Sequence, residues 1–529
     1  MKKGFLQGAV ILSGAGILVK VLGALYRIPL ARILGGEGMG LYQMAYPIYT
    51  SILAISTAGV PVAISILVAE KLAKGDNQGA YRIFRISLTM LTLTGLISSF
   101  LVFSNAKFLA EKVLGEPRAF FAIVAISPAI FFTAVVSAFR GYFQGYQEML
   151  PTAVSQVVEQ LIRVITVLTG SVILLPHGLE LAAGGATFGA VTGGVAALLV
   201  LLVFYKIHSN SNFFQLKGSM KTRDSTLAII LRIFKIAFPL SLGGLVMPLM
   251  QAVDALFVPM GLQAAGLSPA RATELFGQFT GMAGSLINLP SIITISLAVS
   301  LVPAVSGALA LKKLRLAERR ISASNRLALL LCLPAGAGLG ILATPISLML
   351  YDIAEVGIPL RFLAPGVLFL GLYQTTAGAL QGLNKTAYPV INLMIGLIVK
   401  SILNYKLTAI PALNIKGSAI ATVAAFFVAF SLNYLLLKVK FAMKFRLLKT
   451  SVIPLVATGI MVVGTKNIYE IFYYRLSNSF ATLGSIMSGT IIYFFSLLML
   501  GGLGEDDIVL IPRIGQKIAE VLKKLSILR

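Results

Sequence analysis

The chain has 529 residues, of which 57% are hydrophobic and 12% are charged, and its mean hydropathy is +0.91. Soluble domains carry about 25% charged residues, so this composition excludes a soluble globular protein and indicates an integral membrane protein. Its one cysteine and two histidines also exclude a disulfide framework and a metal site built from cysteine or histidine.

Apolar runs long enough to cross a bilayer recur along the whole chain. We predict an all-α integral membrane protein with about fourteen transmembrane helices, because each crossing takes about 20 apolar residues. The predicted spans are 8–30, 42–69, 84–104, 119–138, 152–175, 181–204, 233–258, 276–303, 324–350, 360–380, 388–407, 416–437, 450–465 and 481–503. The gaps are too short for a soluble catalytic domain, and the chain has no G-x-x-x-x-G-K-[ST] phosphate loop. We therefore expect neither enzymatic activity nor a cofactor.

The first predicted span carries two positive charges, Lys20 and Arg27. They are seven residues apart and project from the same face of a helix. A charge at the bilayer centre costs about 2.5 to 3.5 kcal/mol on insertion, so we expect both to face water, a partner or a ligand. The alternative is that they extend to the membrane interface, which applies more to Arg27. The glycine-rich segment that follows, GGEGMG at 35–40, is interpreted as a tight turn.

Two segments, 139–164 and 376–401, resemble each other at an offset of 237 residues. The matched pairs are Gly141 with Gly378, Gln144 with Gln381, Gly145 with Gly382, and Arg163 with Lys400. A period that contains six spans predicts two six-helix lobes, 1–222 and 223–440, followed by two more helices and a basic cytoplasmic tail in 441–529. Duplicated halves are typical of transporters whose site lies near the bilayer midplane, although channels and scaffolds can also be duplicated.

Arg163 and Lys400 are the other two basic residues within predicted spans. Glu159 precedes Arg163 by one helical turn, in the order that favours an ion pair, so this pair could neutralise itself. Lys400 has a glycine at the equivalent position. Asp254, in the seventh span, is a candidate ion-coupling residue or counter-ion, as is Glu159. The alternative for Asp254 is a packing residue hydrogen-bonded to a neighbouring helix.

The basic residues outside the spans are unevenly distributed. About three times as many Lys and Arg residues fall on the side of the N- and C-termini as on the other side, which by the positive-inside rule places both termini in the cytoplasm. The net charge of +25 therefore indicates topology and attraction to anionic lipid headgroups, and no nucleic-acid partner is expected.

Three stretches carry a resemblance to a known family: LVKVLGALYRIPLARILGGEGMGLYQMAYPIY (18–49), STAGVPVAISILVAEKLAKGD (56–76) and FRGYFQGYQEMLPTAVSQVVEQLIRV (139–164). They resemble the polysaccharide biosynthesis branch of the multidrug/oligosaccharidyl-lipid/polysaccharide exporter superfamily, and within it the stage V sporulation protein B-like and lipid II flippase proteins. The resemblance implies two six-helix lobes in a V shape around a cavity, with a groove for a polyprenyl tail at 450–503. It also implies a flippase in the cytoplasmic membrane that moves a lipid-linked glycan precursor, most simply a lipid II-like peptidoglycan precursor, for cell wall or spore cortex synthesis.

The resemblance also points to a binding site. Related lipid II flippases carry R-V-L-G-x-x-R in the first helix, with both arginines in the cavity. Here Lys20 begins the matching stretch, whereas Arg27 comes one residue late and Tyr26 holds the strict position. We predict that Lys20 and Arg27, joined by Arg163 and Lys400, bind the pyrophosphate of the substrate. The membrane potential, or a monovalent cation or proton acting through Asp254, would drive the step.

Three alternatives remain open from the sequence. The first is a cation-coupled antiporter of drugs or small molecules from the same superfamily, which would need carboxylates in its cavity. The second is a membrane glycan polymerase or ligase, although the predicted outer loops are short. The third is a non-transporting scaffold that partners wall-synthesis enzymes. In every case membrane lipids surround the chain, and a lipid-linked glycan is the substrate that the resemblance favours.

Overall fold

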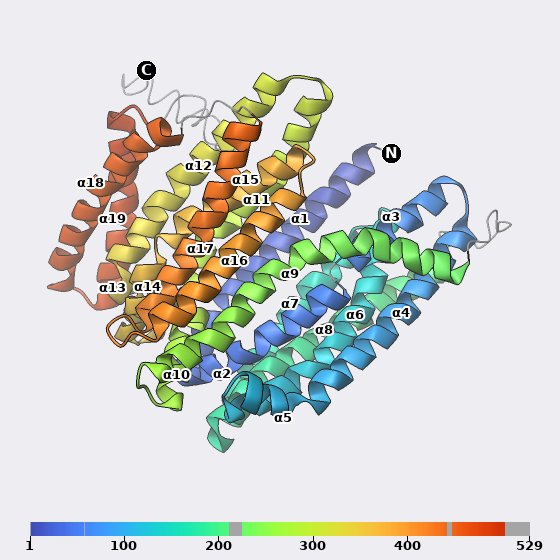
Figure 1. Cartoon of the computed structure of the whole chain (residues 1–529), viewed down its shortest axis with the longest axis horizontal. Helices are drawn as coiled ribbons and strands as arrows, with labels where there is room; N and C mark the ends of the chain where they lie inside the picture. The colour runs from blue at the N-terminus through green and yellow to red at the C-terminus, as the bar shows by residue number, and fades with distance from the viewer. Residues whose placement is uncertain (1, 58, 211–224, 442–446, 503–529) are drawn as a thin grey trace. The chain divides into compact units, whose positions relative to one another are not determined.

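The computed structural model describes residues 2–57, 59–210, 225–441 and 447–502 (Figure 1). Within these ranges the regular structure is helical throughout, and no strand occurs. The predicted basic tail, and most of the basic loop before the seventh span, lie outside the described residues. The predicted all-α fold is confirmed.

Nineteen α-helices and several short 3-10 or π-helical turns follow one another in the described part of the chain. The α-helices are α1 Lys2–Leu25, α2 Arg27–Ser56, α3 Val60–Ala73, α4 Asn77–Ser104, α5 Ala106–Phe108, α6 Phe120–Gly145, α7 Leu150–Leu174, α8 Leu179–Asn210, α9 Thr226–Ala264, α10 Pro269–Phe276, α11 Gly284–Ala310, α12 Leu314–Ile341, α13 Ala343–Tyr351, α14 Gly357–Leu363, α15 Gly366–Gly382, α16 Ala387–Thr408, α17 Ile415–Leu435, α18 Leu447–Tyr473 and α19 Asn478–Met499. The short turns are η1 Leu109–Val113, η2 Pro117–Ala119, η3 Leu175–His177, η5 Gly277–Ala283, η6 Ala354–Val356 and η7 Leu436–Lys440.

Twelve helical stretches in the described residues are long and apolar enough to cross a membrane. A thirteenth is formed if Ala354–Leu363 and Gly366–Gly382, which meet at a bend of 43°, count as one span. The longest stretch, Ile11–Ala73, has 63 residues and covers two of the predicted spans. The chain is therefore a multi-pass membrane protein, as its composition predicts.

The contacts within the chain divide it into two compact units. The first comprises Met1–Met282 and Asn404–Ile415, and the second comprises Ala283–Leu403 and Lys416–Arg529. Both α9 and α10, which follow the predicted lobe boundary at 222, pack within the first unit on α2. The six-helix lobes remain a prediction from the internal repeat.

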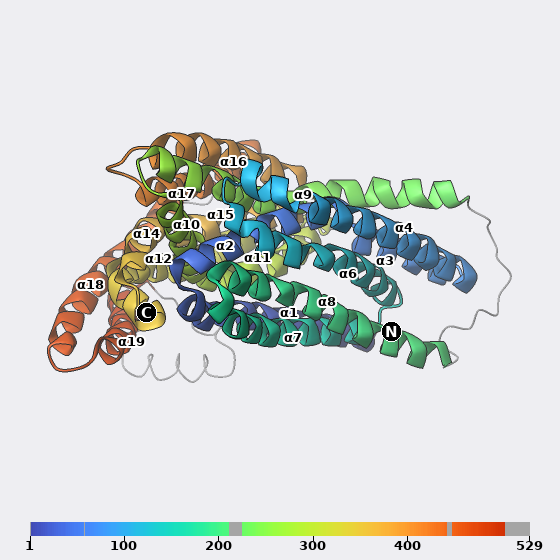
Figure 2. The same ribbon diagram turned by 90° about the horizontal axis from the view of Figure 1, so that it is seen from below.

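In the first unit, α7 and α8 lie side by side in both views (Figure 1 and Figure 2). Glycines permit this approach: a Cβ on Gly193 of α8 would lie 2.8 Å from the carbonyl oxygen of Glu159, and one on Gly189 would lie 2.9 Å from that of Arg163. Small residues are what bring membrane helices into close contact. The α8 backbone therefore supports α7 at the turn that carries Glu159 and Arg163.

Buried polar side chains join the helices of the second unit. Asn392 donates to Asn433 over 2.8 Å, and Thr375 donates to Asn325 over 2.7 Å. Near the end of the described chain α18 packs on α19 and on α12, and the Tyr493 hydroxyl of α19 donates to the Leu330 carbonyl over 3.0 Å. The two helices predicted after the second lobe are thus paired and anchored on this unit.

Candidate functional site

A carboxylate on α7 is shared by two arginines. The Glu159 side chain accepts a hydrogen bond from Arg163 Nη2 over 2.6 Å and another from Arg140 Nη2, on α6, over 2.8 Å. Arg140 Nε also donates to Ser155 over 3.0 Å. The three charged side chains are between 14% and 16% exposed, so they interact at reduced dielectric. The predicted Glu159–Arg163 pair is present, and Arg140 joins it.

Tyrosines of α2 and of the residue before it lie beside these charges. The hydroxyls of Tyr26 and Tyr42 are 2.9 Å apart, and the rings of Tyr42 and Tyr46 are 5.9 Å apart. Arg27 and Arg163 both interact electrostatically with Tyr26 and Tyr46. The first unit therefore gathers Arg27 and Arg163 around the same tyrosines, although 135 residues separate them in the chain, from 27 to 163.

We call Arg27, Arg140, Glu159 and Arg163 the arginine cluster. It contains three guanidinium groups and one carboxylate, so it carries a surplus of positive charge. The buried Nε of Arg163 has no hydrogen-bond partner among the described residues. Buried donors are nearly always satisfied by protein, water or a ligand. This cluster can therefore accept an anion without first breaking its internal ion pairs.

The remaining predicted cations lie elsewhere. Lys20 is exposed on α1, which packs against α7. Lys400 is buried, with 3% exposure, on α16, and it belongs to the second unit, whereas the other candidate residues belong to the first. The structure thus groups Arg27 with Arg163, and a role of all four cations in substrate binding stays a prediction.

The predicted ion-coupling residue Asp254 is buried on α9 and accepts a hydrogen bond from Asn404 Nδ2 over 2.9 Å. The Oδ1 atom of Asn404 is buried and has no hydrogen-bond partner among the described residues. An amide oxygen beside a carboxylate suits a hard cation such as Na⁺ or a proton, and the same hydrogen bond suits a packing role. Within the described residues, no group of three or more histidine, cysteine, aspartate or glutamate side chains could hold a metal ion.

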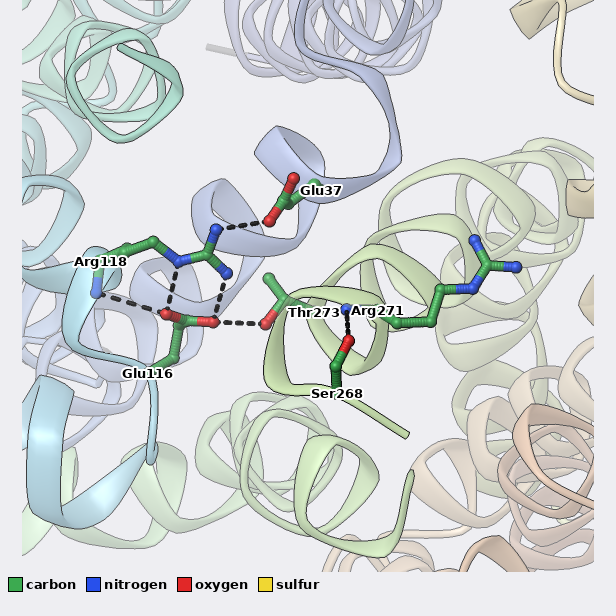
Figure 3. A network of polar contacts seen from close by, with 6 residues as sticks. All are labelled: Glu37, Glu116, Arg118, Ser268, Arg271 and Thr273. Carbon is green, nitrogen blue, oxygen red and sulfur yellow. Dashed lines mark hydrogen bonds and ion pairs between the residues drawn. The ribbon is translucent and has the colours of Figure 1, made fainter. Parts of the chain in front are cut away.

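A second charged group joins three segments of the first unit (Figure 3). Arg118 donates through Nε and Nη2 to the two carboxylate oxygens of Glu116, each over 2.8 Å, and through Nη1 to Glu37 of α2. Thr273 of α10 donates to Glu116 over 2.6 Å. We call these four residues the Glu116 network. Burial raises the pKa of Glu116, but the hydrogen bonds from Arg118 and Thr273 outweigh it and hold that pKa below its ordinary value.

Residues 35–40, interpreted as a turn from the sequence, lie within α2 in the structure. Only Gly35 is non-helical, with φ 65° and ψ −171°, and it kinks the helix. A Cβ on Gly40 would overlap the carbonyl oxygen of Thr273, and one on Gly277 would overlap the backbone of Gly36 and Gly40. The turn interpretation therefore holds at Gly35, where two helices meet across the kink, but not at 36–40, where the glycines serve close helix packing, as in G-x-x-x-G membrane motifs.

Comparisons with known proteins agree with this architecture. The model of the family described as polysaccharide biosynthesis protein matches residues 5–308. Stage V sporulation protein B of Bacillus subtilis is 32% identical over 98% of this chain and 99% of its own length. Lipid II flippase MurJ of the same organism is 27% identical over 90% of both chains.

Solved structures share the fold. An inward-closed structure of lipid II flippase MurJ has a TM-score of 0.68 at 18% identity, with 92% of this chain and 98% of that chain covered. An inward-facing multidrug resistance MATE transporter of the MOP superfamily has the same TM-score at 17% identity, with 82% and 96% covered. From the family match and the full-length relatives together, the chain belongs to the polysaccharide biosynthesis protein family.

Proposed function

We propose that this protein is a flippase that moves a polyprenyl-pyrophosphate-linked glycan precursor across the cytoplasmic membrane by alternating access. A lipid II-like peptidoglycan precursor, used for cell wall or spore cortex synthesis, is the substrate. Two full-length relatives support the proposal, one named as a lipid II flippase and one as a sporulation protein. Both termini lie in the cytoplasm, in keeping with the distribution of Lys and Arg.

The observation that carries the proposal is the positive surplus of the arginine cluster within helices that are long and apolar enough to span a membrane. A pyrophosphate bridge carries an ionised oxygen on each phosphate and presents the planar oxygen pairs that guanidinium groups bind best. In a low-dielectric surround such a contact is stronger than in water. Arg27 and Arg163 bind the pyrophosphate, Arg140 and Glu159 hold Arg163 in place, and Lys20 and Lys400 join along the substrate's path.

In this proposal, the energy for transport does not come from ATP bound to this chain. An elementary charge that crosses the membrane is worth about 2.3 kcal/mol per 100 mV, and an interior-negative potential pushes an anionic headgroup outward. Asp254 with Asn404 is the proposed site through which a proton or monovalent cation couples to the lobes. The predicted groove for the polyprenyl tail is formed by α18 and α19.

A drug or small-molecule antiporter is the second candidate, because the MATE transporter matches the fold with the same TM-score as MurJ. The fold alone therefore does not separate the two functions. The charge of the site does: an organic cation needs a carboxylate surplus, whereas the arginine cluster has the opposite sign. The third reading, a scaffold for wall-synthesis enzymes, requires no substrate site at all.

Transport in proteoliposomes tests the proposal. A fluorescent polyprenyl-pyrophosphate glycan is placed in both leaflets, and its accessibility to an external quencher is followed with an imposed potential. We expect wild type to move the lipid-linked glycan and the Arg27→Gln/Arg163→Gln variant to move it slowly. Transport of an organic cation instead would support the antiporter, and no movement of either would support the scaffold.

A further inference from the structure

A groove with a cationic end lies between α4 and α9, which are neighbours within the first unit (Figure 2). Its volume is about 810 Å³, and its lining changes from polar to mainly apolar along α4. Tyr81, Arg82 and Arg85 line one end. The arginine cluster is elsewhere, on α2, α6 and α7, so this groove is separate from the proposed substrate site.

The cationic end is not neutralised by the residues that the structure describes. Arg82 Nη2 donates to the hydroxyl of Thr226 over 3.4 Å. Neither Arg82 nor Arg85 forms an ion pair with a carboxylate of the described residues. By contrast Arg232, two turns along α9 from Thr226, is paired with Glu70 of α3 over 2.8 Å. Two unpaired guanidinium groups at one end of a groove attract a phosphate.

The rest of the groove has the depth of one membrane leaflet. Ile86, Met90 and Leu93 follow Arg82 at helical spacing and line it. Leu93 comes eleven positions after Arg82, which at about 1.5 Å per residue gives a rise of about 16 Å. That is close to half of a hydrocarbon core of about 30 Å. Leu93 is 54% exposed, so the groove opens sideways, where an acyl chain can enter from the bilayer.

We propose that this groove binds one anionic phospholipid of the membrane. The phosphate lies at Arg82 and Arg85, and an acyl chain runs along Ile86, Met90 and Leu93. A free phosphate would leave this apolar lining unused, and a choline or ethanolamine headgroup would bring its own cation next to two arginines. The bound lipid fastens α4 to α9 and stabilises the first unit.

Lipid binding to the purified full-length protein tests this. Delipidated protein in detergent is titrated with phosphatidylglycerol or with phosphatidylcholine of the same acyl chains, and occupancy is read by native mass spectrometry. Each basic residue contributes about fivefold to binding of an anionic lipid, so Arg82→Gln/Arg85→Gln should weaken phosphatidylglycerol binding about 30-fold. Wild type should prefer phosphatidylglycerol, which should also raise its melting temperature.

The matched control is Arg315→Gln/Arg319→Gln, which removes the same charge from an exposed basic turn at the start of α12. Its effect should stay within about threefold, as for a screened surface charge. Equal weakening by the two double variants, or equal binding of the two lipids by wild type, would overturn the site.

A third variant separates a lipid from a free headgroup. Met90→Trp fills the groove and keeps both arginines, so it should lose phosphatidylglycerol while its melting temperature without lipid stays near that of wild type. Glycerol phosphate, which has the headgroup without the chains, should compete poorly. Undiminished lipid binding by Met90→Trp, or competition by glycerol phosphate as strong as by phosphatidylglycerol, would contradict an acyl-chain groove.

Discussion

The arginine cluster and the Glu116 network are built from the same residue types in opposite proportion. The first has two guanidinium groups on Glu159 and a third, that of Arg27, beside the same tyrosines as Arg163, whereas the second has two carboxylates around Arg118. Arg118 uses Nε, Nη1 and Nη2 on carboxylates, whereas Arg163 has a buried Nε without a partner in the described residues. The guanidinium nitrogens of Arg118 are all used to hold segments of the protein together, whereas the unused donor of Arg163 can bind a ligand.

The Glu116 network lies beside a contact between glycines, and this contact offers the largest expected effect. Gly40→Ala would place a methyl group on the Thr273 carbonyl, so we expect a loss of about 3 kcal/mol in unfolding free energy, as for overpacking of a tight core. The measurement is a thermal melt in detergent.

Gly16→Ala is its matched control, because a Cβ there meets no atom within 4 Å. In a helix this change should be neutral or stabilise by up to about 1 kcal/mol. If both variants melted at the same temperature, the close packing at Gly40 would not contribute to the stability of the protein.

Loss of the shared carboxylate is the next test. Glu116→Gln weakens both contacts with Arg118 and the acceptor for Thr273, so we expect a loss of about 2 kcal/mol without a change in affinity for the lipid-linked glycan. Glu111→Gln is the control, since its pair with Lys107 is exposed and 3.9 Å long and should contribute less than about 0.5 kcal/mol. A fall in glycan affinity for Glu116→Gln would make the network part of the substrate site.

In the arginine cluster, loss of the carboxylate should also change the affinity for the glycan substrate. Glu159→Gln removes the one carboxylate, so the proposed pyrophosphate site becomes more positive, and affinity for the glycan substrate should rise about fivefold. Its melting temperature should fall, because Arg140 and Arg163 then repel each other. Weaker binding by this variant would assign Glu159 to ion coupling or to the substrate itself.

Acid should weaken the Glu116 network gradually. The pKa of Glu116 is lower in the folded protein than its ordinary value, so its contribution to stability is complete above a pH of about 4.5 and is lost as the pH falls below that. The difference in melting temperature between wild type and Glu116→Gln should therefore narrow in acid. A difference that widened below pH 4.5 would mean that the pKa is raised.

Local patterns in the sequence predicted the membrane spans and singled out Arg27, Glu159 and Arg163, three of the four residues of the arginine cluster. Hydropathy located the membrane helices, and the spacing of four residues predicted the ion pair of Glu159 and Arg163. Arg140 was missed because it lies outside the predicted span 119–138 and 19 residues before Glu159, so no local spacing relates the two. Its counterpart in the internal repeat is Ala377, so the repeat gave no signal either.

The Glu116 network could not be predicted from the sequence, for a similar reason. Glu37 and Arg118 are 81 residues apart, and no helical periodicity relates them. One signal was available: Gly36 with Gly40, and Gly277 with Gly281, each form a G-x-x-x-G spacing. In a membrane protein that spacing indicates helix packing as readily as a turn, and it marks the two segments that meet.

The most direct test of the central claim is the affinity of the purified protein for a polyprenyl-pyrophosphate glycan. Arg27→Gln/Arg163→Gln is compared with wild type and with Arg361→Gln, an exposed cation on α14. With charge-assisted contacts worth about 1.5 to 3 kcal/mol each, the double variant should lose about 100-fold in affinity or more, with its melt unchanged and Arg361→Gln like wild type. Equal affinity in all three proteins would contradict a pyrophosphate site at the arginine cluster.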